Sequence, residues 1–296
     1  MTSKHTLLLI IALAITAGCS GLRLELKNAS VQKPSNVALY FTVDTAGGDP
    51  VPGLLAGQFN IYEDGKLIST YESRQTILNP RVASARHTLL LLDMSGSVVD
   101  SGQVPVIQAA VETFVWSLGE QERVAIYAFD GREEITRVSD FETDKEKLKQ
   151  GVAGLSTWKT KDPSTNLHGA VVQAAAILEE ERDQAEVPLS FGTLVVFTDG
   201  TDRAHRSTLK EAVTAVEETD VGMFVIGLGG EVDQAQMERL GRDGFVHVDN
   251  QDAIVEAFHT VAQRILGQAA RFYLLSYCSP SRAGQHRLTV EAVSGE

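Results

Sequence analysis

The chain has 296 residues, of which 43% are hydrophobic and 22% charged, the composition of an ordinary globular protein. Its 26 Lys and Arg residues face 39 Asp and Glu residues, a net charge of -13, and no basic stripe interrupts this acidity. Such a surface repels phosphate backbones, so we expect no nucleic-acid binding. The only two cysteines, Cys19 and Cys278, exclude a disulfide framework and cysteine-based zinc sites.

Residues 1–18 have the pattern of a secretion signal. Lys4 precedes an apolar run, Leu7–Ile15, that is too short to span a bilayer as a stable anchor. The segment Ala17-Gly18-Cys19 resembles the end of a bacterial lipoprotein signal, in which the cysteine is lipidated. This resemblance implies lipidation of Cys19 and a membrane-anchored protein of the bacterial cell envelope, in the outer membrane or facing the periplasm in a Gram-negative cell. Ordinary secretion is the alternative.

A small β unit is predicted next. Residues 19–35 are mixed and polar, which favours a tether, and residues 36–44 alternate apolar and polar side chains as a half-buried strand does. A second alternating run from Gln58 turns at Asp64-Gly65 and returns, which predicts a β-hairpin. Residues 36–80 show no helical period and are expected to form an antiparallel β unit.

Strands alternate with helices from Arg86 onward. Four consecutive leucines, Leu89–Leu92, predict a strand buried on both faces, and a polar stretch at 134–141 suits an edge strand. Further buried strands are expected at 123–129, 193–198, 221–227 and 245–248, and helices at 103–118, 144–155, 166–182, 207–218, 233–240 and 252–266. This alternation predicts an α/β fold, with a doubly wound, mostly parallel sheet carrying helices on both faces over residues 86–267.

The strand period returns at 271–277 and 285–293. We expect these strands, in the segment 270–296, to join the unit at 36–80 and complete a small antiparallel β-sandwich, because neither part has enough strands to be stable alone. Two independent β pieces are the alternative. Cys278 is interpreted as a packing residue of its strand rather than a nucleophile.

Polar ligand types gather where strands of the α/β region end. Asp93, Ser95 and Ser97 follow the leucine strand at alternate positions, and Asp199 ends the strand at 193–198. Thr165 precedes the helix at 166–182 and is expected at the same end of the sheet, where open α/β sheets bind ligands. A buried carboxylate needs a cation, and two carboxylates with three hydroxyls suit Mg²⁺, Mn²⁺ or Ca²⁺ rather than zinc or copper.

These segments resemble the metal-ion-dependent adhesion site of von Willebrand factor type A (VWA) domains. The D-x-S-x-S motif of the family matches Asp93, Ser95 and Ser97, and its threonine and later aspartate match Thr165 and Asp199. The resemblance implies that the five residues hold a divalent ion, Mg²⁺ first, and leave one position open for an acidic residue of a protein partner.

Other interpretations of the same residues are weaker. An EF-hand loop fails because Val98 stands where glycine is needed, and a haloacid-dehalogenase-like phosphatase would need a carboxylate at Ser95. Simple turn chemistry remains open for Asp93 to Ser97 taken alone. His168 is more often structural than a metal ligand at such a position, and Trp158 is a loop residue near the site. Asp130 and Asp202 border the same face and are expected at most to support the site.

The leading hypothesis is a non-catalytic, lipid-anchored envelope protein that captures a protein partner through the ion, for adhesion or complex assembly. A metal-dependent hydrolase is an alternative from another class, although no acid or base is convincingly placed beside the site. A structural subunit of an envelope complex, with an architectural ion, is a third possibility.

Overall fold

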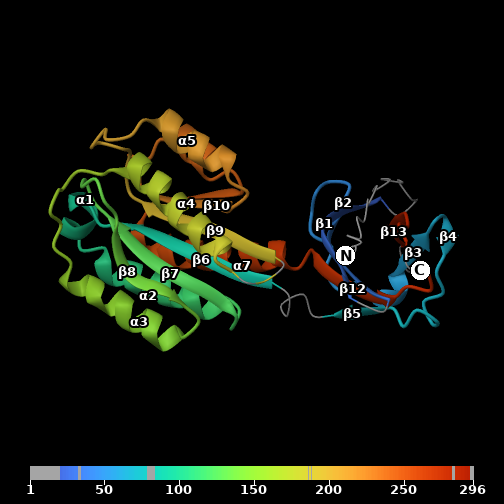
Figure 1. Cartoon of the computed structure of the whole chain (residues 1–296). Helices are drawn as coiled ribbons and strands as arrows, with labels where there is room; N and C mark the ends of the chain where they lie inside the picture. The colour runs from blue at the N-terminus through green and yellow to red at the C-terminus, as the bar shows by residue number, and fades with distance from the viewer. Residues whose placement is uncertain are drawn as a thin grey trace, which may run out of the picture. The chain divides into compact units, whose positions relative to one another are not determined.

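A computed structural model describes residues 21–32, 35–78, 84–185, 187, 189–281 and 284–293. The predicted signal and Cys19 lie outside these residues. The chain divides into two compact units, one formed by Met1–Ala83 with Gly267–Glu296 and the other by Ser84–Leu266. Each unit is built around its own sheets (Figure 1).

The larger unit contains the predicted doubly wound sheet. Its six strands lie in the order β11-β10-β9-β6-β7-β8, and all neighbouring strands are parallel except β7 and β8. The strands are β6 (Ser84–Asp93), β7 (Glu122–Phe129), β8 (Thr136–Glu142), β9 (Leu189–Thr198), β10 (Gly222–Leu228) and β11 (Gly244–Val248). The leucine strand β6 is central, and chain order reverses on its two sides, which is where open α/β sheets bind ligands.

Helices cover both faces of this sheet (Figure 1). One face packs against α1 (Gly96–Asp100), α2 (Val104–Ser117), α3 (Lys145–Ala153) and α7 (Ile254–Ala269). The other face packs against α4 (Leu167–Asp183), α5 (Leu209–Glu218) and α6 (Gln234–Leu240). The predicted α/β fold class is therefore confirmed.

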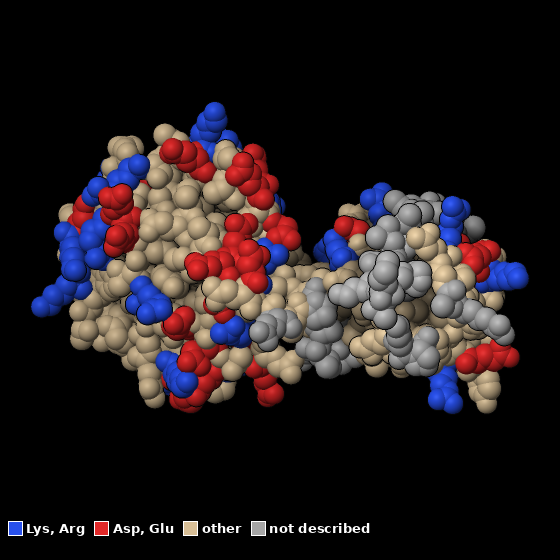
Figure 2. Space-filling view, in the orientation of Figure 1, with Lys and Arg blue, Asp and Glu red and all other residues tan. Residues whose placement is uncertain are grey.

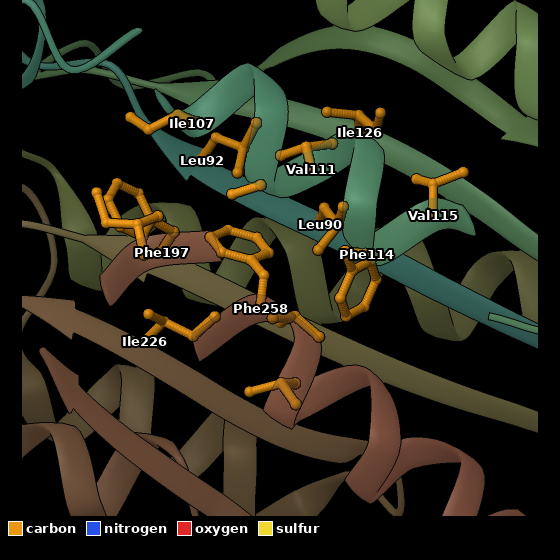
Figure 3. Packing of buried hydrophobic residues seen from close by; sticks show 14 of the residues in the cluster. Leu90, Leu92, Ile107, Val111, Phe114, Val115, Ile126, Phe197, Ile226 and Phe258 are labelled. Carbon is orange, nitrogen blue, oxygen red and sulfur yellow. The ribbon is translucent and has the colours of Figure 1, made fainter. Parts of the chain in front are cut away.

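The four leucines of β6 divide between the two cores. Leu90 and Leu92 point into one core and meet α2 and α7, where Phe114 packs edge-on against Phe258 (Figure 3). Leu89 and Leu91 belong to the other core, beneath α4. All four leucines are fully buried, and burial of one such side chain contributes about 2 kcal/mol. Packing on both faces therefore fixes the position of β6 and of Asp93 at its end.

The smaller unit consists of two antiparallel sheets, in the orders β1-β2-β12-β5 and β13-β3-β4. Its strands are β1 (Leu22–Gln32), β2 (Asn36–Thr45), β3 (Phe59–Glu63), β4 (Lys66–Leu67), β5 (Thr76–Leu78), β12 (Phe272–Cys278) and β13 (Leu288–Ala292). The C-terminal strands β12 and β13 pair with the N-terminal strands β2 and β3, as predicted, and a shared core includes Phe41, Phe59 and Tyr273.

Three predictions differ from the structure. Residues 22–32 of the expected tether form β1, because Leu22, Leu24 and Leu26 alternate with charged residues and pair with β2. Cys278 is exposed at the last position of β12 and so is not a packing residue. The short helix α1 was not expected after β6.

No helix among the described residues is long and apolar enough to span a bilayer.

On the face seen in Figure 2, Lys and Arg side chains lie singly or in small groups between Asp and Glu side chains.

Candidate metal centre

Asp93 ends the central strand with a fully buried carboxylate. Its Oδ1 accepts a hydrogen bond from the backbone N–H of Ser95 at 2.9 Å, and its Oδ2 accepts one from the hydroxyl of Thr198 at 2.7 Å. Thr198 is the last residue of the neighbouring strand β9 and is itself fully buried. The ends of two adjacent strands thus fix this carboxylate in one orientation.

The two serines follow at the start of α1. Ser95 is buried in extended backbone before the first helical turn, and its hydroxyl oxygen lies 3.2 Å from that of Ser97. The Ser97 hydroxyl is exposed and donates to Oδ1 of Asp199 at 2.9 Å. Four of the predicted ligands are therefore brought together at the carboxyl ends of β6 and β9.

Thr165 joins this group through its backbone. It is buried, and its carbonyl accepts hydrogen bonds from the N–H groups of Arg203 and Ala204 at 2.8 and 3.0 Å. Two residues earlier, the Pro163 carbonyl accepts from Gly96 N–H at 3.0 Å, inside the D-x-S-x-S segment. A Cβ on Gly96 would lie 2.9 Å from the Cβ of Pro163, so glycine allows this close approach. The Thr165 loop is therefore fastened directly to the loops that carry the other ligands.

No direct ion pair among the described residues neutralises the two carboxylates, although the charge of Arg203 acts on Asp199 from a distance. Burial, followed by the nearby charge of Asp199, raises the pKa of Asp93 to about 6. Burial also raises the pKa of Asp199. Among the described residues neither aspartate forms an ion pair. Two desolvated carboxylates side by side favour a bound cation.

The donor atoms fit a hard divalent ion. Asp93 and Asp199 supply carboxylate oxygens, and the hydroxyls of Ser95, Ser97 and Thr165 supply neutral oxygens, the ligand types preferred by Mg²⁺ and Ca²⁺. No cluster of three or more His, Cys, Asp or Glu suited to a metal occurs in the described part of the chain. The candidate site thus combines two carboxylates with three hydroxyl groups.

An open hollow adjoins the candidate site. It has a volume of about 420 Å³, and Ser97 and Asp199 form part of its wall. Loops after β10 and β11 complete the wall with residues that include Glu231, Asp249 and Asn250. A group entering this hollow can reach the Ser97 and Asp199 side chains without rearrangement of the two buried ligands, Asp93 and Ser95.

The residues around the site have the structural and supporting roles that were predicted for them. The imidazole of His168 lies 3.2 Å from the Ser207 carbonyl and 3.4 Å from the Gln236 amide oxygen, which gives it a structural role. Asp202 accepts hydrogen bonds from the backbone N–H groups of His168, at the start of α4, and of His205, in the loop after β9. It supports the site by fixing these two segments.

Asp130 supports the Thr165 loop from the other side. Its carboxylate binds Arg132 and accepts from the Lys161 N–H at 3.2 Å, while its carbonyl accepts from the Asn166 N–H at 3.1 Å. The Arg132 guanidinium lies 5.9 Å from the ring centre of Trp158, which places Trp158 against this loop.

Sequence reasoning missed Thr198, although its position directly before Asp199 at a strand end was a usable signal.

Comparison with known proteins identifies the larger unit. The family model described as von Willebrand factor type A domain matches residues 89–262. A search of curated proteins finds no match.

Solved structures share the fold at low sequence identity. A von Willebrand factor type A protein from Catenulispora acidiphila is 12% identical, with a TM-score of 0.53 over 93% of this chain and 70% of that chain. Proximal thread matrix protein 1 from the mussel byssus is 11% identical, with a TM-score of 0.52 over 69% of this chain and 51% of its own. A structure of the mussel protein with a zinc-occupied metal-ion-dependent adhesion site (MIDAS) motif is 14% identical, with a TM-score of 0.50. The match covers 62% of this chain and 48% of that chain. Because the family model covers more than half of the residues, the chain belongs to the von Willebrand factor type A domain family.

Proposed function

We propose that the VWA domain binds a divalent cation, Mg²⁺ in the first instance, through Asp93, Ser95, Ser97, Thr165 and Asp199. The observation that carries this proposal is the fully buried Asp93 carboxylate, which has no cationic partner among the described residues and lies close enough to Asp199 for their charges to interact. A cation would relieve both the desolvation and the repulsion. The zinc-occupied MIDAS motif of the mussel protein supports the assignment by analogy of fold.

The proposed role of the ion is to capture a carboxylate of a protein partner. Two aspartates balance the charge of a divalent ion without excess, so the ion still attracts a third carboxylate. The hollow beside Ser97 and Asp199 supplies an approach for that side chain. When bound, the ion would supply electrostatic attraction and directional coordination.

We propose a binding role rather than catalysis. The two histidines nearest the site, His168 and His205, donate backbone N–H hydrogen bonds to Asp202, and their imidazole Nδ1 atoms lie 3.7 and 3.8 Å from its carboxylate. Neither histidine is among the residues that line the hollow. Attachment to the cell envelope through Cys19 remains part of the proposal and rests on the signal-like sequence alone.

Calorimetric titration with Mg²⁺, Mn²⁺, Ca²⁺ and Zn²⁺ tests the metal site. The wild-type protein should bind one equivalent of Mg²⁺, and Asp199→Asn should abolish most of this affinity without unfolding the protein. Ser207→Ala is a matched control, because its carbonyl rather than its hydroxyl contacts His168. Equal Mg²⁺ affinity in wild type and Asp199→Asn would refute the site assignment.

Partner capture needs a separate measurement. Wild-type protein immobilised on a resin should retain a partner from the native envelope fraction in Mg²⁺, release it in EDTA, and fail to retain it when Asp199→Asn is used. Retention that persists in EDTA would refute capture through the ion.

A further inference from the structure

The segment after Asp199 is fastened to the Thr165 loop by an arginine that no sequence motif marks. Arg206 lies seven positions beyond Asp199, after a turn in which His205 adopts a positive φ of 51°. Its guanidinium spans two different chain segments. Nε donates to the Gly131 carbonyl at 2.5 Å, and Nη2 donates to Oδ2 of Asp162 at 3.1 Å.

Asp162 passes this contact on toward Thr165. Its Oδ1 accepts from both the N–H and the hydroxyl of Ser164, at 3.1 and 2.7 Å. Its carbonyl accepts from the Gly131 N–H at 3.1 Å, so the 131 and 162 segments are also bonded directly to each other. The carboxylate of Asp162 therefore orders the two residues that lead into Thr165.

The junction is closely packed around Gly131. A Cβ on Gly131 would lie 2.0 Å from the Ser164 hydroxyl oxygen and 2.4 Å from the Asp162 carboxyl carbon. The Thr165 carbonyl is bonded at the same time to the N–H groups of Arg203 and Ala204, in the segment that ends at Arg206. Segment 162–165 is thus joined to segment 203–206 in two ways. Arg206 binds the Asp162 side chain, and the N–H groups of Arg203 and Ala204 bind the Thr165 carbonyl.

The geometry requires a guanidinium at position 206. A carbonyl and a carboxylate on different segments are bound simultaneously by two nitrogens of one planar group. A lysine ammonium is a single point charge and cannot hold both acceptors in this fixed arrangement. The side chain is 41% exposed, so its role in the core is small and its contacts with the loops dominate.

We propose that Arg206 is a positioning residue of the metal centre, which holds the Thr165 hydroxyl in place for the ion by clamping residues 131 and 162. The inference rests on the proposed metal-binding function and adds to it a residue outside the five ligands. Partners that hydrogen-bond directly to metal ligands typically change metal affinity by about 10–100-fold when they are mutated. Arg206 acts through Asp162 and Ser164, so we expect the lower end of this range.

The test is Mg²⁺ titration of full-length wild type, Arg206→Met and Arg206→Lys. Arg206→Met should weaken Mg²⁺ binding by roughly tenfold or more, and Arg206→Lys should recover only part of the loss. Asp162→Asn should also weaken binding, and the double variant Arg206→Met with Asp162→Asn should lose less affinity than the sum of the two single losses, because both changes break the contact between Arg206 and Asp162.

Two controls separate positioning from charge and from folding. Arg203→Met removes the same charge from a side chain that pairs with Glu231, so it should leave metal binding equal or tighter. Arg137→Met breaks an exposed ion pair with Asp140 on β8 and should change nothing. The melting temperature in EDTA and hydrogen exchange of residues 159–166 report the fold and the loop. Faster exchange should be confined to this loop in Arg206→Met.

The outcomes are distinct. If the wild type binds Mg²⁺ and Arg206→Met binds it with the same affinity, the inference is overturned and the proposed function stands. An equal affinity loss in Arg203→Met and Arg206→Met assigns the effect to a general disturbance of the segment after Asp199 and also overturns the inference. Absence of Mg²⁺ binding in the wild type overturns the proposed function, and this inference with it.

Discussion

Replacement of Thr198 by valine tests how the buried carboxylate of Asp93 is maintained. Valine keeps the shape of threonine and removes the hydroxyl that donates to Asp93 at 2.7 Å. A hydrogen bond to a charged group contributes about 1.5–3 kcal/mol, whereas one to a neutral group contributes about 1 kcal/mol. The cost of Thr198→Val in metal-free protein should therefore depend on the ionisation state of Asp93.

The pKa of about 6 places that dependence on the pH scale. Asp93 binds its proton more tightly in the folded chain than at its ordinary value of 3.8, so the folded state holds more protons between these values. Stability of the metal-free protein falls as pH rises through this window, by about 3 kcal/mol at 1.36 kcal/mol per pH unit. Above pH 6 this contribution is constant, and a bound cation would offset it.

Tryptophan fluorescence during urea unfolding in EDTA provides the assay. Both tryptophans of the chain, Trp116 and Trp158, lie in the larger unit, so the signal reports that unit alone. Thr198→Val should lose about 2 kcal/mol of unfolding free energy at pH 8 and about 1 kcal/mol at pH 4.5. The Thr198 hydroxyl also contacts the Gly200 N–H and carbonyl at 3.3 Å, and this part of the loss should be the same at both pH values. The Asp93→Asn variant cannot titrate at this position, so its unfolding free energy gives the baseline for the pH dependence that comes from other groups. Equal losses at the two pH values would refute the reasoning.

Three further changes test other parts of the molecule. Saturating Mg²⁺ at one hundred times the dissociation constant should stabilise the larger unit by about 2.7 kcal/mol, and EDTA or Asp199→Asn should remove this gain in thermal melts. Leu90→Ala should cost about 2–5 kcal/mol in urea unfolding, because the fully buried side chain leaves a cavity beneath two helices; a loss below 1 kcal/mol would contradict the packing. Tyr277→Phe should cost about 1–3 kcal/mol in the smaller unit, because it removes the hydroxyl that donates to buried Glu63 at 2.7 Å. Calorimetry should detect this loss while tryptophan fluorescence stays unchanged.

Much of the fold could be predicted because its pattern is local. A run of four leucines is typical of a central strand that is buried on both faces, and the polar change at Asp93 marks the end of that strand. The convergence of Asp93 and Asp199 follows from parallel strands that end at one edge of a sheet. Thr165 could be placed at that edge because it precedes a helix.

The remaining features depend on contacts between distant residues. Thr198 and Arg206 act through partners 105 and 75 positions away in the chain, which no local period encodes. The charged residues of strand β1 lower its apparent hydrophobicity and favour a tether in the sequence, although Leu22, Leu24 and Leu26 alternate as in a strand. The exposure of Cys278 depends on where β12 ends, and element ends are the least predictable part of a sequence.

The smaller unit also constrains the order of events during synthesis. Strand β2 has β1 on one side and β12 on the other, yet Thr42 and its partner Phe272 are separated by the whole larger unit. Whether the chain emerges from a ribosome or from a secretion channel, β1 to β5 emerge before β12 and β13, and the larger unit can fold in between. Until then one edge of β2 is open, and the apolar side chains of Leu39 and Phe41 lack their cover. The N-terminal strands thus need protection from aggregation until the last two strands arrive.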